Sequence, residues 1–299
     1  MPALGQPAPP LQILCFLIIG RHVEVTCGDD EIAGVMLANF AATAATRLEG
    51  TPDLRYAVSA NEAPCSGYSI ERSGHGIVID ARRIDDLLFH FEKDLVVALQ
   101  ELRPELLFLH AAALEHGGRA ILLVGASGHG KSTTAWGLLH HGFGYLSDEL
   151  APVELDALLV HPYPHALSLK ERPPAAFALP AGEALDLGRT LHVPVAALPA
   201  GAGERAVSAC PLGAVLFVRF RADRPAPVLR AIGRAEAAVR LYVCTLNALA
   251  HPGKGLDAVL RIAERVPCFA LDAAELNATC ELVSRFAAAG ADAAPDGCP

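Results

Sequence analysis

The chain has 299 residues, which is enough for one large domain or two smaller ones with a full hydrophobic core. Although 52% of its residues are hydrophobic, no stretch reaches the roughly 18 consecutive apolar residues of a membrane-spanning helix. The net charge of −9 and the lack of any Lys/Arg cluster longer than a pair disfavour a nucleic-acid-binding surface.

The sequence indicates neither export nor a zinc or redox motif. The most apolar run, residues 13–19, has no basic segment before it and no small-residue cleavage site after it, which disfavours a signal peptide. The eight cysteines are scattered, and no Cys-x-x-Cys pair occurs among them. We therefore expect reduced, mostly buried thiols in a cytoplasmic protein.

The first hundred residues predict a small α+β module. Residues 1–10 are expected to form a disordered leader. Beyond the leader, the pattern of apolar residues and turn signals predicts two strands within 11–25, a helix that begins near 29, a strand at 54–58, a hairpin over 68–79 and a helix from 85 to 103. Because Pro104 ends that helix, the module is assigned to residues 11–103.

A larger domain is expected over residues 104–287, followed by a disordered tail over 288–299. A strong apolar run over 106–113 is interrupted by His110. Further apolar runs predict strands at 120–124, 142–146, 214–220 and 268–271, and helical spacing predicts helices at 132–141, 234–246, 255–263 and 275–287. The Pro-, Ala- and Gly-rich segment 171–211 predicts long loops with one short helix. The expected fold class is therefore α/β, with a mixed sheet flanked by helices.

The motif Gly-x-x-x-x-Gly-Lys-Ser at 125–132 follows an apolar strand and precedes a helix, which is the context of a phosphate-binding P-loop. Glycines let the backbone aim several N–H groups at phosphate oxygens, and the helix adds the positive end of its dipole. Lys131 can reach the β- and γ-phosphates, while Ser132 can offer its hydroxyl to Mg²⁺. The expected nucleotide-binding residues are Gly125, Ala126, Ser127, Gly128, His129, Gly130, Lys131, Ser132 and Thr133.

Three further polar residues accompany this loop. Asp148 ends the apolar strand after the P-loop helix, where an acid can hold Mg²⁺ or accept a proton from a substrate hydroxyl. Glu149 follows directly, and adjacent side chains on extended backbone point opposite ways, so the two acids should differ in role. His110 interrupts an apolar run, where a hydrogen-bonded core histidine is the usual interpretation of such a residue taken alone.

The segments Leu109-His110-Ala-Ala, Gly125–Ser132 and Leu146–Glu149, in this order and spacing, resemble the catalytic domain of the HPr kinase/phosphorylase family. They are more similar still to the HPr-kinase-related proteins found beside peptide-tailoring genes. A looser resemblance continues at 162–170, 212–217 and 267–271, so that roughly residues 104–285 are covered. The resemblance implies a P-loop-containing fold like that of HPr kinase and phosphoenolpyruvate carboxykinase.

The resemblance also implies roles for individual residues. Lys131 and Ser132 would bind the ATP phosphates and Mg²⁺, with Asp148 and Glu149 as further metal-site residues. Asp148 would take the proton from the substrate serine, and His110 would contact this acid, which promotes His110 from core residue to catalytic residue. HPr kinases are hexamers, so the resemblance also implies a homo-oligomer.

The sequence departs from the family in two places. The second acid of the family is usually Asp, whereas this chain has the longer Glu149. The glycine-rich loop that follows the acids in the family is not visible, because the corresponding segment 167–174 contains no glycine. Since that loop is tied to the reverse reaction, phosphorylase activity is not expected.

The leading hypothesis is an ATP- and Mg²⁺-dependent kinase that phosphorylates a serine hydroxyl on a small protein or peptide. Lys170 and Arg172 are weaker candidates for contacts to phosphate or substrate. Two alternatives stay open: a nucleotide-binding regulatory or scaffold protein without transfer activity, and a P-loop ATPase or small-metabolite kinase. An Arg-rich lid would favour a metabolite kinase, and none is visible in the sequence.

Overall fold

The computed structural model describes residues 11–46, 49–61, 66–203 and 208–289. The chain divides into two compact units, residues 1–102 with 187–189 and residues 103–186 with 190–299. The predicted disordered leader, 1–10, lies outside the described residues, and so does the predicted tail from residue 290 onward. Ala288 and Ala289, which were expected in the tail, extend the last helix instead.

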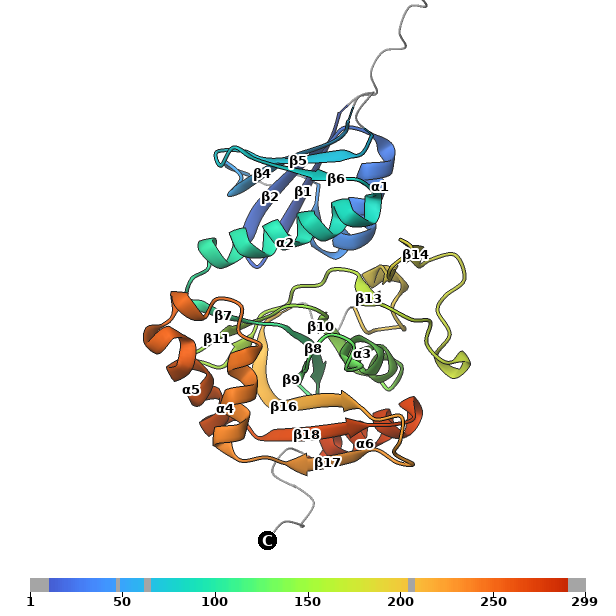
Figure 1. The fold of residues 1–299 in the computed structure, drawn as a ribbon, viewed down its shortest axis with the longest axis vertical. Coiled ribbons are helices and arrows are strands. Elements are labelled where there is room, and N and C mark those ends of the chain that lie inside the picture. The colour runs from blue at the N-terminus through green and yellow to red at the C-terminus, as the bar shows by residue number, and fades with distance from the viewer. Residues whose placement is uncertain (1–10, 47–48, 62–65, 204–207, 290–299) are drawn as a thin grey trace, which may run out of the picture. The chain divides into compact units, whose positions relative to one another are not determined.

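The N-terminal unit is a six-stranded sheet with two helices (Figure 1). Its strands lie in the order β3-β1-β2-β4-β5-β6, and only the β2–β4 pair is parallel among the pairs of this sheet. The strands are β1 (Gln12–Ile18), β2 (Arg21–Cys27), β3 (Ala44–Ala45), β4 (Leu54–Ala60), β5 (Tyr68–Arg72) and β6 (Ile77–Ala81). The helical segments are α1 (Asp30–Phe40), the short η1 (Ala41–Thr43) and α2 (Ile84–Leu102).

One face of this sheet forms the core of the N-terminal unit. Helix α1 begins where the Asp29 side chain accepts a hydrogen bond of 2.8 Å from Ile32 N, which satisfies one of the free amides of the first turn. The Phe40 ring lies between two others in the core, with its centroid 5.7 Å from that of Phe16 and 5.8 Å from that of Phe91. Because side chains alternate along a strand, the residues between the buried ones lie on the opposite face.

The C-terminal unit is built on a mixed sheet, as expected from its sequence. Its strands are β7 (Leu106–Leu109), β8 (Ala111–His116), β9 (Arg119–Val124), β10 (Gly144–Ser147), β11 (Ala151–Glu154), β12 (Leu159–Val160), β16 (Cys210–Phe220), β17 (Val228–Ala231) and β18 (Cys268–Ala273). The long strand β16 pairs in parallel with β9 and β18, and β8 and β10 continue the sheet antiparallel beyond β9. At its start β16 pairs with β12, which leads through β11 to β7.

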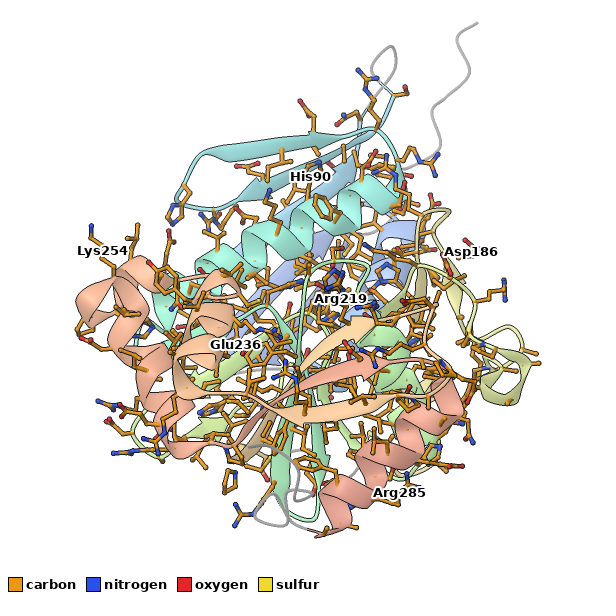
Figure 2. All side chains as sticks on the ribbon, turned by 60° about the horizontal axis from the view of Figure 1, so that its bottom comes forward. His90, Asp186, Arg219, Glu236, Lys254 and Arg285 are labelled. Carbon is orange, nitrogen blue, oxygen red and sulfur yellow. The ribbon has the colours of Figure 1, made fainter. Side chains whose placement is uncertain are left out.

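Helices cover both faces of this sheet. On one face, α3 (Lys131–His140) and α6 (Leu276–Ala289) share an apolar cluster with alternate residues of the strands. On the other face, α4 (Arg234–Val243) and α5 (Leu256–Arg265) form a second cluster with the strand residues in between. Helix α6 buries Val283 and Phe286, while Arg285 between them is exposed to solvent (Figure 2).

The structure adds detail to two segments of this unit. The apolar run 106–113 forms two strands, since His110 divides it into β7 and β8, which belong to different parts of the sheet. Within segment 171–211, where the sequence predicts long loops and one short helix, the described residues include short strands as well as short helices. The segment holds β14 (Leu185–Asp186), β15 (Leu191–Val193), η2 (Ala175–Phe177) and η3 (Val195–Ala197), and β15 pairs with both β14 and β13 (Leu167–Leu169).

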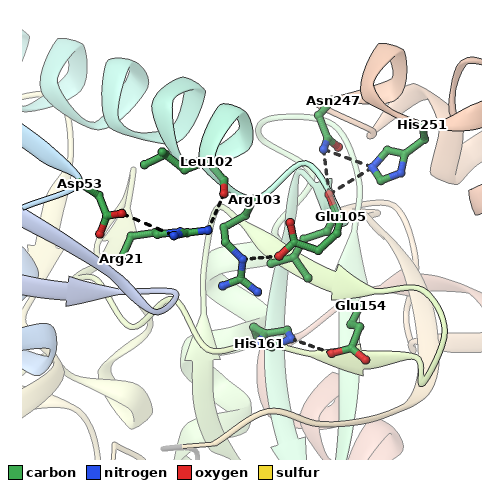
Figure 3. A network of polar contacts seen from close by, with 10 residues as sticks. Arg21, Asp53, Leu102, Arg103, Glu105, Glu154, His161, Asn247 and His251 are labelled. Atoms are coloured by element: carbon green, nitrogen blue, oxygen red, sulfur yellow. Dashed lines mark hydrogen bonds and ion pairs between the residues drawn. The ribbon is translucent and has the colours of Figure 1, made fainter. Parts of the chain in front are cut away.

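The break at His110 is held in place by the segment that follows α4. His110 N donates a hydrogen bond of 2.7 Å to Cys244 O, and Leu246 N donates one of 2.8 Å to Phe108 O. The Asn247 amide accepts from Phe108 N at 2.9 Å and donates to Leu106 O at 2.8 Å, and its contact with His251 is drawn in Figure 3. Two short helices, η4 (Ala248–Ala250) and η5 (Pro252–Gly255), then lead into α5.

Candidate active site

The segment between β9 and α3 has the backbone conformation that its glycines allow. Gly128 and Gly130 have φ angles of +82° and +89°, in the left-handed region that side chains with a Cβ rarely adopt. Gly125 is restricted differently, because a Cβ there would lie 2.7 Å from Val218 O. Phe220 N donates 3.1 Å to His129 O, so β16 fixes both ends of the loop.

Lys131 is the first residue of α3, and its side chain folds back over the loop. Only 5% of the residue is exposed. Its ammonium group donates 2.9 Å to Gly125 O and lies 3.2 Å from His110 Nε2. Both contacts hold the positive charge beside the open loop, whose residues 126–128 are exposed. Ser132 and Thr133, the next two residues of α3, are partly exposed.

His110 lies between Lys131 and Glu149. Its Nδ1 is 3.2 Å from the Glu149 carboxylate and 3.2 Å from the Glu149 carbonyl oxygen, while Nε2 faces Lys131. An ammonium group can only donate, so Nε2 must present its lone pair and Nδ1 must carry the proton. Both ring nitrogens are thus engaged, and His110 meets Glu149 where the family resemblance implies contact with Asp148.

Asp148 directly follows β10 and is fully buried. Its Oδ2 accepts a hydrogen bond of 3.1 Å from Ser168 N, whereas the buried Oδ1 has no hydrogen-bond partner among the described residues. Burial, followed by the negative charge of Glu149, raises the pKa of Asp148 to about 7. The hydrogen bond from Ser168 N, the nearby Ser132 hydroxyl and the charge of Lys131 lower this pKa in turn.

The two adjacent acids differ in environment, as expected for neighbours on extended backbone. The Asp148 carboxylate is enclosed, whereas 48% of the Glu149 side chain is exposed. The Ser132 hydroxyl at the start of α3 lowers the pKa of Asp148, so the residue after β10 and the start of α3 contribute to one site. Glu149 instead reaches His110 on the other side of the backbone.

Strand β13 contributes two contacts that the sequence did not assign to particular partners. Its Ser168 binds Asp148, and Lys170, the residue after the strand, donates 2.5 Å to Ser127 Oγ in the loop. A second cation, besides Lys131, therefore lies beside the loop 125–130. Arg172, the other weak candidate, lies 3.9 Å from Asp186 with 72% of its side chain exposed, and it does not join this cluster.

These residues fit a nucleotide phosphate chain and a divalent cation. Positive charge gathers at this loop and suits phosphate oxygens. It comes from the loop amides, the N-terminus of α3, Lys131 and Lys170. The unpartnered Oδ1 of Asp148 and the hydroxyl of the nearby Ser132 are the kind of oxygen ligands that Mg²⁺ prefers. The arrangement can therefore combine phosphate binding, metal binding and proton acceptance within one cluster.

Solved structures, but no sequence families, resemble the chain. No protein-family model and no curated protein sequence matches the chain. Among solved structures, the HPr(Ser) kinase/phosphatase from Coxiella burnetii matches with a TM-score of 0.31 and 14% sequence identity, over 61% of this chain and 94% of that chain. No helix among the described residues is long and apolar enough to cross a membrane.

Proposed function

We propose that the protein is an ATP- and Mg²⁺-dependent kinase that transfers the γ-phosphoryl group to a serine hydroxyl of a small protein or peptide. The observation that carries the proposal is the convergence of a buried lysine and a buried acid at the start of α3. Lys131 faces the loop, and Asp148 lies beside Ser132. Phosphoryl transfer needs these two elements, a cationic clamp on the phosphates and an acceptor for the hydroxyl proton.

The proposed mechanism depends mainly on alignment and charge. The amides of 125–130 and the Lys131 ammonium bind the phosphate oxygens and hold the γ-phosphoryl group in line with the acceptor. Ser132 and Asp148 would hold Mg²⁺, which supplies further neutralisation of the phosphate charge when bound. Glu149, which the sequence also suggested as a metal ligand, is engaged with His110 on the other side of the backbone and is left out of the metal site. Asp148 orients the serine hydroxyl and accepts its proton as the new O–P bond forms, and the pKa near 7 suits a base at neutral pH.

His110 is a positioning residue in this proposal. It accepts from the Lys131 ammonium through Nε2 and donates to Glu149 through Nδ1, so it links the cation of the clamp to the second acid. Its influence on Asp148 is therefore indirect, through Lys131 and Glu149, whose charges both act on the Asp148 carboxyl. Lys170 would add a further contact to phosphate beside Ser127.

The serine acceptor is inferred from the sequence resemblance to HPr kinases.

The cytoplasm is proposed as the location because the described cysteines are free thiols. A regulatory protein that binds nucleotide without transfer, or a small-metabolite kinase or ATPase, would use the same loop and lysine. The test below is designed to separate these functions.

The experiment is incubation of the full-length protein with γ-labelled ATP, Mg²⁺ and candidate serine-containing peptides. The kinase proposal predicts label on a peptide serine, reduced at least about 100-fold in Lys131→Ala and in Asp148→Asn. Lys93→Ala, an exposed lysine on α2, is the matched control and should keep full activity. Tight ATP binding with neither transfer nor hydrolysis would refute the kinase, and hydrolysis without any labelled peptide would favour the ATPase alternative.

A further inference from the structure

We propose that Cys15, His22 and Glu24 form a zinc-binding site on the β1–β2 hairpin of the N-terminal unit. One thiol sulfur, one imidazole nitrogen and one carboxylate oxygen, one from each residue, all lie within 4.8 Å of one another. All three residues belong to the N-terminal unit, and none of them is a residue of the candidate active site.

Strand register brings the three side chains together. In the antiparallel pair, Cys15 of β1 stands opposite Glu24 of β2, and His22 lies two residues before Glu24 on the same strand. Side chains two apart on a strand share a face, and directly opposed residues do as well. The three groups therefore project from the same face of the sheet, opposite to the face that buries Phe16 and Val23.

His22 supplies the independent sign that this cluster binds something. Only 9% of the residue is exposed, yet neither Nδ1 nor Nε2 has a hydrogen-bond partner among the described residues. A buried imidazole without a partner is costly, and coordination of a metal would satisfy one of its nitrogens. The ring also lies close to the Cys15 thiol and the Glu24 carboxylate, and among the described residues these three side chains are the one group placed to share a metal ion.

The backbone of His22 is fixed before any metal binds. His22 N donates 2.8 Å to the Asp53 carboxylate, and Asp53 N donates 2.9 Å to His22 O. The Arg21 guanidinium donates hydrogen bonds to the Asp53 carboxylate, at 3.4 Å, and to Leu102 O, at 2.8 Å, and Figure 3 shows both contacts. A ligand on a rigid strand loses little conformational entropy on binding, which favours tight coordination.

The ligand set favours zinc over the harder cations. Sulfur and nitrogen donors with one carboxylate are typical of tetrahedral zinc sites, whereas Mg²⁺ and Ca²⁺ prefer oxygen donors. Zinc–ligand bonds of about 2.0–2.3 Å would draw the three donor atoms closer, a change that side-chain rotation can provide. The Cys15 thiol would release its proton to solvent as the zinc–sulfur bond forms.

The carboxylate has an oxygen available for the metal. Glu24 Oε1 lies 3.4 Å from Arg55 Nε, an ion pair in which 53% of the Arg55 side chain is exposed. Such an exposed pair contributes little, and the second carboxylate oxygen remains for coordination. Three protein ligands leave the fourth tetrahedral position open to water.

The test is titration of the metal-free full-length protein with Zn²⁺ and, separately, with Co²⁺, in excess Mg²⁺ so that the candidate active site is not counted. The proposal predicts one zinc per chain and a thiolate-to-cobalt charge-transfer band. Because loss of a group that merely supports a ligand weakens binding 10- to 100-fold, Cys15→Ser, His22→Gln and Glu24→Gln should each weaken zinc binding by at least about 100-fold.

Two matched substitutions serve as controls. Cys244→Ser removes another partly exposed thiol, and Glu71→Gln removes an exposed carboxylate from the same sheet. Both should leave the affinity and the cobalt band unchanged. The proposal is overturned if the wild-type chain binds no stoichiometric zinc, or if Cys15→Ser, which retains the shape of the side chain, keeps the wild-type affinity. A cobalt complex without the charge-transfer band would overturn it equally.

Discussion

At the scale of single residues, His110 is where the structure adds most to the motif. It holds Lys131 from one ring nitrogen and Glu149 from the other. We predict that His110→Ala lowers kcat for phosphoryl transfer by about 10- to 100-fold, because the Lys131 ammonium loses one of its two fixed contacts. The KM for ATP should change less, since the loop amides remain. His75→Ala, in the exposed turn between β5 and β6, is the control, and an unchanged kcat in His110→Ala would contradict this role.

Sequence and structure agree best where the determinants are local. The glycines at 128 and 130 and the helix that begins at Lys131 follow from adjacent residues, and so does the position of Asp148 at the end of a strand. The partners of His110 do not follow in this way. They depend on the break between β7 and β8, which residues 244–247 stabilise and which orients the His110 side chain.

At the scale of helices, the packing of α3 against α6 holds the helix that follows the loop 125–130. Gly137 faces α6 so closely that a Cβ there would lie 2.5 Å from Cys280 Sγ and 2.9 Å from Leu276 Cδ1. Gly137→Ala should therefore lower the free energy of unfolding by about 1–3 kcal/mol in denaturant titrations, through overpacking.

Gly34 in α1 is the matched control for this prediction. Nothing lies within 4 Å of the Cβ that would be added there, and the residue is exposed. Gly34→Ala should be neutral or stabilising by roughly 0.5–1 kcal/mol, because alanine has the higher helix propensity. Equal effects of the two substitutions would show that helix propensity, rather than the contact between α3 and α6, determines the result.

Strand β13 and its neighbours could not be predicted in the same way. Segment 171–211 is dominated by Pro, Ala and Gly, which signal loops, and β13 pairs with β15 across more than twenty residues. The contact of Lys170 with Ser127 spans 43 positions and follows no motif. The Cys15, His22 and Glu24 cluster likewise needs a strand register, because its spacing resembles no known zinc motif.

At the scale of the whole molecule, buried histidines should make stability depend on pH. Burial, with the nearby His192, lowers the pKa of His165 to about 3, and burial lowers that of His192 to about 4. Below about pH 6.5 the unfolded chain takes up protons that the folded chain does not, so stability falls as the pH falls. The loss is up to about 1.4 kcal/mol per pH unit for each histidine.

The variant His165→Leu tests this dependence. It places an apolar side chain of similar size at a site where neither imidazole nitrogen of His165 has a hydrogen-bond partner among the described residues. Denaturant titrations between pH 7 and pH 4 should give a shallower loss of stability for the variant than for the wild type, while the two differ little in slope above pH 7. Parallel curves across the whole range would contradict the assignment.

The central claim is that residues 125–132 bind the phosphates of ATP through Lys131, and calorimetric titration with a non-hydrolysable ATP analogue and Mg²⁺ tests it most directly. We predict one site per chain, with affinity reduced at least about tenfold in Lys131→Ala, because a charge-assisted hydrogen bond contributes roughly 1.5–3 kcal/mol. Lys93→Ala should bind as the wild type does. Undiminished binding by Lys131→Ala, or no binding by the wild type, would contradict the account.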